Sequence, residues 1–358
     1  QKQASLCYKK LNMSKKNSNV ILKNNFKHYE ELSKIYSLFS KKLKSLKKKS
    51  FLIALSGGPD SLALTALAKS YSYKNKCKIY FVLIDHNLRK DSSKEAYSVK
   101  RLLKKNHVSL NIIKNKKTIE KNIQSEARKI RYDLLTSFCK KKKIKVILTA
   151  HNFEDQVETF FIRLSRGSGL HGLSSMKEIN TITKKIVLVR PLLETKKTQL
   201  KKIARLIFGK FYKDPTNTDR KYLRTRIRSL KNSLELSGLN YDRIFQSINN
   251  LASSRDTLDL FFNKIYLKIV NISKKGVNIN FKEYKKLNQE MKFRIMKRSI
   301  QDFTNSYYSA RSKKILNLIQ QIENNEKVKH FLSGCVIFRG KNHLIVKKQN
   351  KSIKFNKN

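Results

Sequence analysis

A glycine-rich loop between two apolar segments restricts the fold of this chain more than any other feature. The apolar run at 51–55 ends in Ser56-Gly57-Gly58-Pro59-Asp60-Ser61, and an Ala- and Leu-rich segment follows to about Tyr73. The two glycines let the backbone come close to a ligand, and Pro59 suits the first turn of a helix. The free N–H groups of that turn and the positive end of the helix dipole favour a bound phosphate. The sequence therefore predicts a strand, a phosphate-binding loop and a helix.

The polar side chains of this loop indicate which phosphates it holds. Ser56 and Ser61 can donate hydroxyl hydrogen bonds, and Asp60 suits a magnesium ion between the loop and the phosphates. The pattern differs from the P-loop, because no lysine follows the second glycine. A shorter cradle of this kind fits the two outer phosphates of ATP, so that cleavage releases AMP and pyrophosphate. A plain tight turn is the competing interpretation, and the expected strand and helix around the loop argue against it.

Apolar runs alternate with helical segments as far as residue 189, and this alternation predicts a parallel sheet with helices on both faces. The expected strands are 51–55, 79–85, 110–113, 146–150 and 187–189, and the expected helices include 26–48, 119–142 and 152–166. The glycine loop then lies at the carboxyl edge of the sheet, where open α/β sheets bind their ligands.

The alternation stops at about residue 240. The segments expected beyond it are helices at 242–271, 286–303 and 309–325, followed by a hairpin of 335–338 and 343–346. We therefore predict three parts: a basic flexible arm at 1–25, an α/β catalytic domain at 26–235, and a smaller, mainly helical α+β domain at 240–358.

The chain is strongly basic, with 81 Lys and Arg against 25 Asp and Glu and a net charge of +56. A field of that size attracts polyanions, so contact with nucleic acid is expected. The competing interpretation is a lysine-covered surface without a particular ligand, and the lysine runs at 41–49 and 140–145 are interpreted in this way. No apolar stretch has the roughly 18–20 residues of a membrane helix, and the first 25 residues lack a secretory signal. A cytoplasmic protein without a membrane partner is therefore expected.

The cysteines give no sign of a metal or redox centre. Cys7, Cys77, Cys139 and Cys335 form no Cys-x-x-Cys pair. This spacing argues against a zinc ribbon, an iron–sulfur site or a redox dithiol. Four reduced thiols are the preferred interpretation.

An acidic stretch follows the expected strand at 146–150. On a continuous helix, His151, Glu154, Asp155 and Glu158 would share one face. Acids favoured by the dipole at a helix start are the alternative. Because the stretch lies at the carboxyl edge of the sheet and acids are scarce in this chain, we favour a face that holds a cationic substrate or a magnesium ion.

Two arginine-containing segments are candidates for phosphate contacts. Arg224, Arg226 and Arg228 form a compact cluster after an Asx/Pro turn at 214–219, and arginine is suited to bidentate phosphate binding. The segment 163–169 combines arginines with glycines that permit a sharp turn. A plain glycine helix stop explains that second segment nearly as well.

Together these motifs resemble the tRNA(Ile)-lysidine synthetase family, within the wider PP-loop class of ATP pyrophosphatases with an adenine nucleotide alpha hydrolase-like fold. Four further stretches fit the family: 85–89, 126–132, 163–172 and 190–193. The match covers about 51–228, and the hairpin at 333–339 resembles the family's small following domain more weakly. Asn152 departs from the pattern, because the family often has a second histidine there. The chain is also shorter than three-domain members, which puts the last tRNA-binding domain in doubt.

The resemblance implies a two-step reaction. ATP first adenylates the 2-oxygen of the cytidine at the first anticodon position of a CAU-anticodon tRNA(Ile), and free L-lysine then displaces AMP. It implies ATP and Mg²⁺ as cofactors and no DNA partner. The loop 56–61 would bind ATP, with Asp60 on magnesium, while Asp155 and Glu158 would attract lysine and one carboxylate would accept its proton. Arg131 and the cluster Arg224 to Arg228 would neutralise phosphate on ATP or tRNA, with His151 and Glu154 as further substrate contacts.

Three alternatives stay open. A tRNA thiolation enzyme with the same loop would need paired or catalytic cysteines, which the cysteine positions do not favour. A basic RNA-binding protein without catalysis would have no use for the intact Asp60 or for the acidic stretch. An amidotransferase would need a glutaminase domain or a cysteine at its amino terminus, and Cys7 is too far from residue 2 for that.

Overall fold

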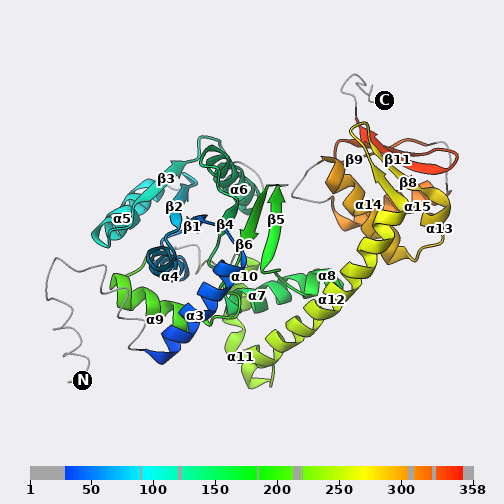
Figure 1. The fold of residues 1–358 in the computed structure, drawn as a ribbon. Coiled ribbons are helices and arrows are strands. Elements are labelled where there is room, and N and C mark those ends of the chain that lie inside the picture. Colours follow the sequence, from blue (N-terminus) through cyan, green and yellow to red (C-terminus); the bar gives the residue numbers. More distant parts are fainter. Residues whose placement is uncertain are drawn as a thin grey trace. The chain divides into compact units, whose positions relative to one another are not determined.

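The protein is described here by a computed structural model (Figure 1). The structure describes residues 29–88, 91–119, 123–183, 185–212, 219, 221–304, 310–324 and 328–349. The predicted arm at 1–25 lies outside these residues. The chain divides into two compact units, with the boundary between Asn250 and Leu251. No helix in these ranges is both long enough and apolar enough to span a membrane.

The first unit is built on a six-stranded sheet with the order β3-β2-β1-β4-β6-β5. Its strands are β1 (Ser50–Leu55), β2 (Lys78–Asp85), β3 (Leu110–Lys114), β4 (Val146–Leu148), β5 (Ile179–Thr183) and β6 (Ile186–Val189). The first four strands and β6 are parallel, as the sequence predicts. The edge strand β5 is antiparallel to β6 and was not predicted, because this short strand is mostly exposed or half-buried and lacks a continuous apolar run.

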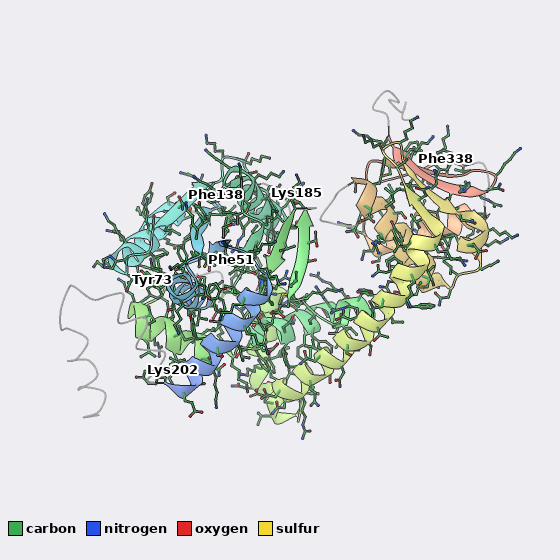
Figure 2. All side chains as sticks on the ribbon, in the orientation of Figure 1. Phe51, Tyr73, Phe138, Lys185, Lys202 and Phe338 are labelled. Carbon is green, nitrogen blue, oxygen red and sulfur yellow. The ribbon has the colours of Figure 1, made fainter. Side chains whose placement is uncertain are left out.

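Helices cover both faces of this sheet. The helices α3 (Glu30–Ser45), α4 (Pro59–Asn75), α5 (Ser92–Lys105) and α9 (Lys197–Phe208) share one apolar core with the sheet. Phe51 of β1, labelled in Figure 2, is fully buried in this core and meets the ring of Tyr71 edge-on. Helix α6 (Ile123–Lys141) packs against β2 and β4. Helix α6 lies on the opposite face from α4 and α5 because the crossovers are right-handed. The chain moves outward from β1 to β3, through α4 and α5, and then returns to β4 through α6.

This reversal places a switch point between β1 and β4, where ligands bind in open α/β sheets. The loop after β1 leads into α4, and the chain after β4 leads into α7 (Phe153–Leu164). Three short helices follow: α8 (Leu170–Leu173), α10 (Leu223–Ser229) and α11 (Lys231–Leu236). The start of α12 (Tyr241–Ile269) also belongs to this unit, since Tyr241, Ile244 and Ile248 pack with Phe153 and Val157 of α7.

The second unit combines helices with a five-stranded antiparallel sheet of order β7-β8-β11-β10-β9. Its further elements are β7 (Val270–Ile272), β8 (Val277–Asn280), α13 (Phe281–Lys285), α14 (Gln289–Thr304), α15 (Ser312–Asn324), β9 (His330–Leu332), β10 (Cys335–Arg339) and β11 (His343–Lys348). Its core joins the sheet to the inner faces of α14 and α15 and to the end of α12. The predicted hairpin is β10–β11, whereas β7, β8 and β9 have three or four residues each and were not predicted.

Candidate active site

The glycine loop has the geometry of a backbone cradle. Gly58 is the N-cap of α4 and Pro59 is its first residue, so no side chain at the cap position occupies the amide groups of the first turn. The hydroxyl of Ser61 donates to the carbonyl of Gly58 at 2.9 Å and lies 3.3 Å from the hydroxyl of Ser56. These contacts hold the loop closed on itself while the helix N-terminus stays open to an anion.

Gly57 is required at its position for two reasons. Its φ is +83°, and an added Cβ would lie 2.5 Å from Cγ2 of Val99 on α5. The carbonyl of Gly57 also accepts a hydrogen bond from the amide of Tyr212 at 3.2 Å. Helix α5 and the chain after α9 therefore both contact the loop, so a side chain at position 57 would displace the loop.

Asp60 lies in the first turn of α4 with one carboxylate oxygen, Oδ1, buried and without a hydrogen-bond partner. Burial raises the pKa of Asp60 from 3.8 to about 6. The ammonium of Lys197 opposes this rise, and the carboxylates of Asp155 and Glu154 add to it. A buried carboxylate oxygen without a donor is costly unless a bound group satisfies it.

These residues fit a magnesium ion that is bound together with nucleotide phosphates. Magnesium in nucleotide sites is held by one or two carboxylates and by phosphate oxygens, and the unsatisfied Oδ1 of Asp60 matches that donor set. Within the described part of the chain, no group of three or more His, Cys, Asp or Glu residues could hold a metal by itself. The loop is therefore suited to a metal that arrives with ATP.

The chain after β4 differs from the predicted continuous acidic helix. Helix α7 begins at Phe153, and Asn152 is its N-cap in a reciprocal capping box with Asp155. His151 lies before the helix and therefore does not share its face, which corrects the prediction. The structure also gives Asn152 a role, because asparagine is among the preferred N-cap residues and histidine is not.

The three acids of α7 have different surroundings. The carboxylate of Glu154 accepts a 2.8 Å hydrogen bond from the amide of Lys197 and so caps α9. One oxygen of Asp155 serves the capping box, and the other lies 3.6 Å from Nη2 of Arg228. Glu158 is 2 % exposed. Only Asp155 and Glu158 therefore combine a carboxylate with a cationic neighbour from α10.

Glu158 is paired with two arginines of α10. Nε and Nη2 of Arg228 donate to its two oxygens at 2.5 and 3.0 Å, and Nε of Arg224 lies 3.3 Å from Oε2. Burial raises the pKa of Glu158, and the hydrogen bond from Arg228 offsets part of that rise. Burial by itself would lower the pKa of Arg228, but the carboxylates of Glu158 and Asp155 raise it overall.

The arginines predicted as one phosphate-binding cluster are thus divided. Arg224 and Arg228 lie one turn apart on α10 and point to Glu158, whereas Arg226 is exposed. In the segment 163–169, Arg163 donates to the carbonyls of Gly172 and Ser175 at 2.7 and 2.8 Å. Those bonds hold the turn after α7, so the interpretation of Arg163 as a phosphate contact gives way to a structural role.

A second group of polar residues surrounds His151. Burial lowers the pKa of His151 well below 6.5, and the nearby guanidiniums of Arg190, Arg128 and Arg131 add to this shift. Thr149 lies 2.9 Å from Nδ1 of His151. The imidazole is therefore neutral at physiological pH, and it lies among cations at the end of β4.

Lys197 is a candidate site residue that the sequence analysis missed. Its charge is the strongest opposing influence on the pKa of Asp60, and its amide is fixed by Glu154. In the described ranges no carboxylate forms an ion pair with it. A lysine among so many others carries no signal in a single sequence, and its position near Asp60 depends on the packing of α9 against α4.

The fold and the loop define the class of this protein. Residues 30–234 match the PP-loop domain family, so the first unit is a PP-loop domain. Among solved structures, the chain is similar to the U34-tRNA thiolase NcsA from Methanococcus maripaludis, with a TM-score of 0.51 and 17 % identity. That similarity covers 62 % of this chain and 79 % of the other, and at such identity it shows the fold alone.

Proteins with similar sequences identify the family within this class. The chain is 33 % identical over 305 residues to tRNA(Ile)-lysidine synthase from Wolbachia pipientis wMel, covering 84 % of this chain and 70 % of that protein. It is 44 % identical over 188 residues to the protein of the same name from Orientia tsutsugamushi (strain Boryong), covering 52 % and 42 %. The chain belongs to the tRNA(Ile)-lysidine synthase family.

Proposed function

We propose that this enzyme joins free lysine to the 2-position of the first-anticodon cytidine of a CAU-anticodon tRNA(Ile), using ATP and magnesium. Adenylation of the base oxygen would release pyrophosphate, and displacement by lysine would release AMP. The modified base would pair with A instead of G, so that codon and amino-acid specificity would change from methionine to isoleucine. The observation that carries the proposal is the PP-loop with its unsatisfied Asp60 beside an acidic pair, in a chain of this family.

The loop would bind the leaving pyrophosphate. The first-turn amides of α4 would meet the anion at the switch point, on a loop that the hydroxyls of Ser56 and Ser61 hold closed. Lys197 would add an ammonium that forms no ion pair with a carboxylate of the described residues. Asp60 would hold the magnesium ion, which when bound supplies positive charge to the phosphates. The buried Oδ1 of Asp60 would then have a partner.

The carboxylates of Asp155 and Glu158 would hold the amine substrate. Each already has an oxygen within 4 Å of an Arg228 nitrogen, so cationic groups are accommodated at both. Lysine must lose a proton before its amine attacks, and one of these carboxylates would accept that proton.

A thiolation reaction has less support, although the structural neighbour NcsA carries a [4Fe-4S] cluster. Of the three cysteines in the described ranges, Cys139 and Cys335 are buried, and Cys77 is half-buried in the link between α4 and β2. Burial raises the pKa of the Cys139 thiol to about 12 and also raises that of Cys77. Neither thiol is primed as a nucleophile for sulfur transfer.

The first step can be tested without lysine. Purified enzyme, magnesium, ATP labelled at the α-phosphate and a CAU-anticodon tRNA(Ile) transcript should give labelled RNA. Addition of lysine should release the label as AMP. Asp60→Ala should abolish labelling, whereas Asp91→Ala, which removes an exposed acid at the N-cap of α5, should not. Label that enters RNA but is not released by lysine would disprove the lysine step and leave adenylation standing. We expect the reaction in the cytoplasm.

A further inference from the structure

One end of the Asn152 side chain has a hydrogen-bond partner and the other end does not. Its Oδ1 accepts a hydrogen bond of 3.0 Å from the amide of Asp155, and the Asp155 carboxylate accepts one of 3.2 Å from the Asn152 amide. Its Nδ2 is buried and forms no hydrogen bond within the part of the chain that the structure describes. The residue is 0 % exposed, so bulk water does not reach this nitrogen.

The capping box determines which way the side-chain amide of Asn152 faces. An asparagine amide carries an acceptor oxygen at one end and two N–H donors at the other. Exchange of the two ends would place a donor against the Asp155 amide, which is itself a donor. Oδ1 therefore faces the first turn of α7, and the NH₂ group is turned away from the Asp155 amide.

The cap explains the oxygen of Asn152 but not its NH₂ group. Serine and aspartate begin helices about as well as asparagine, and neither would bury an NH₂ group. Buried donors without an acceptor are costly unless a bound group accepts from them. The NH₂ group of Asn152 is therefore suited to an acceptor from outside the chain.

Asn152 lies at the switch point of the sheet. β4 and β1 are parallel neighbours in which Leu148 pairs with Ile53. After Leu148 the chain reaches Asn152, the N-cap of α7, and after Ile53 it reaches Gly58, the N-cap of α4. Neighbouring strands are only about 4.8 Å apart, so both N-caps border the space beyond these two strand ends.

The position and burial of this donor indicate which acceptor it meets. The open first turn of α4 favours an anion at the same strand ends, and phosphate oxygens accept hydrogen bonds from neutral N–H groups. The full burial of Asn152 favours a ligand bound deep in the site over RNA, which approaches from the surface. A nucleotide phosphate meets both conditions.

We propose that the NH₂ group of Asn152 donates a hydrogen bond to a phosphate oxygen of ATP. The inference rests on the proposed function and adds a residue of the α7 N-terminus to the loop at 56–61. Asn152 then has two tasks, because Oδ1 caps the helix that carries Asp155 while Nδ2 holds the nucleotide. The histidine that the family often has at this position could also donate an N–H, although it is a poor N-cap.

Two substitutions separate these tasks. Asn152→Ser keeps a capping oxygen and removes the NH₂ donor, whereas Asn152→His keeps an N–H donor and removes the cap. Asn152→Asp repeats the loss of the donor at unchanged side-chain size. Asn280→Ser is the matched control, because Asn280 caps α13 in the second unit by accepting from the Glu283 amide at 3.2 Å. Calorimetry measures binding of ATP with magnesium to the complete protein, without tRNA or lysine, and thermal unfolding is followed without ATP.

We expect Asn152→Ser to weaken ATP binding by roughly 10- to 100-fold, with a thermal midpoint within about 2 °C of wild type. Asn152→Asp should weaken ATP binding at least as much, because its carboxylate repels phosphate. Asn152→His should lower the midpoint by about 2–4 °C and keep ATP binding within about threefold. Asn280→Ser should leave ATP binding within about twofold.

Wild-type ATP affinity in folded Asn152→Ser and Asn152→Asp proteins would overturn the proposal. Equal losses of ATP binding in the serine and histidine variants would overturn it as well, because they would follow from altered packing and not from the donor. An acceptor on RNA would leave ATP binding unchanged and weaken tRNA binding in Asn152→Ser, which also contradicts the proposal. The proposed function fails separately if the wild-type enzyme transfers no lysine to tRNA while ATP binding still depends on the Asn152 donor.

Discussion

The guanidinium of Arg228 forms hydrogen bonds of 2.5 and 3.0 Å to the two carboxylate oxygens of Glu158, a residue 70 positions earlier in the chain. This pair joins α10 to α7 beside the PP-loop. Because Glu158 is buried, the stability of its charged form depends on its arginine partners. Each partner can therefore be tested by mutation.

Removal of Arg228 should destabilise the first unit. Arg228→Ala leaves the Glu158 carboxylate buried with only the more distant Arg224, and the expected loss is about 2–3 kcal/mol in the free energy of unfolding. Arg226→Ala, on the same helix but exposed, should change it by less than about 0.5 kcal/mol. Urea unfolding followed by circular dichroism measures both. Equal losses in the free energy of unfolding for the two variants would show that the Arg228–Glu158 pair contributes no more to stability than the exposed Arg226 does.

Alanine at Gly57 should disturb the loop more than alanine at another glycine of positive φ. Both Gly57 and Gly167 have positive φ, but only at Gly57 would the new Cβ meet a neighbour, Val99. We expect Gly167→Ala to cost about 1 kcal/mol and Gly57→Ala more than about 2 kcal/mol, with a loss of ATP binding. Thermal unfolding with and without ATP and magnesium measures both effects. Normal ATP binding by Gly57→Ala would contradict the close contact with α5.

The half-buried Asp60 should make stability depend on pH in a defined direction. Its native pKa of about 6 exceeds its ordinary value of 3.8, so between these values the native state binds more proton than the unfolded state. The contribution of this Asp60 pKa shift to the free energy of unfolding is complete below about pH 4, and it disappears as the pH rises through about 6. Asp60→Asn should therefore gain stability relative to wild type between pH 4 and 8, by at most about 3 kcal/mol. Urea titrations in the presence of a chelator, from pH 4 to 8, give this difference. A constant difference across that range would refute the pKa shift.

Lys197 should support phosphate binding and hold down the pKa of Asp60. Lys197→Met should weaken pyrophosphate and ATP binding by roughly tenfold, because a charge-assisted contact is lost. It should also move the pH midpoint of the Asp60 effect upward, since the opposing positive charge is removed. Lys201→Met, an exposed position on α9, is the matched control. If both lysine variants bound pyrophosphate equally well, Lys197 would not belong to the site.

The elements predicted most accurately are those with strong local patterns. The strand before the loop and the helix after it came from an apolar run, two glycines and a proline, and the structure confirms them as β1 and α4. Helices α5 and α9 were not predicted, although their buried apolar residues recur at helical spacing. Local sequence shows periodicity, but it does not show which amphipathic segments find a sheet to cover.

The sequence names candidate site residues but does not show the contacts between them. The loop, Asp60 and the acids of α7 were candidates because their spacing is local, and their roles stay predictions. The N-cap at Asn152, which moves His151 off the helix, depends on where the helix begins, a point that sequence fixes poorly. The pairing of Glu158 with Arg228 and the approach of Lys197 to Asp60 depend on tertiary packing between distant segments.

Incorporation of labelled lysine into tRNA tests the central claim most directly. The assay combines enzyme, ATP and magnesium with a CAU-anticodon tRNA(Ile) transcript, and with initiator methionine tRNA as the control RNA. We predict lysine incorporation and AMP release in equal amounts on the isoleucine tRNA, none on the initiator tRNA, and none with Asp60→Ala. AMP release without lysine incorporation would keep the PP-loop chemistry and contradict the assignment of lysine as the substrate.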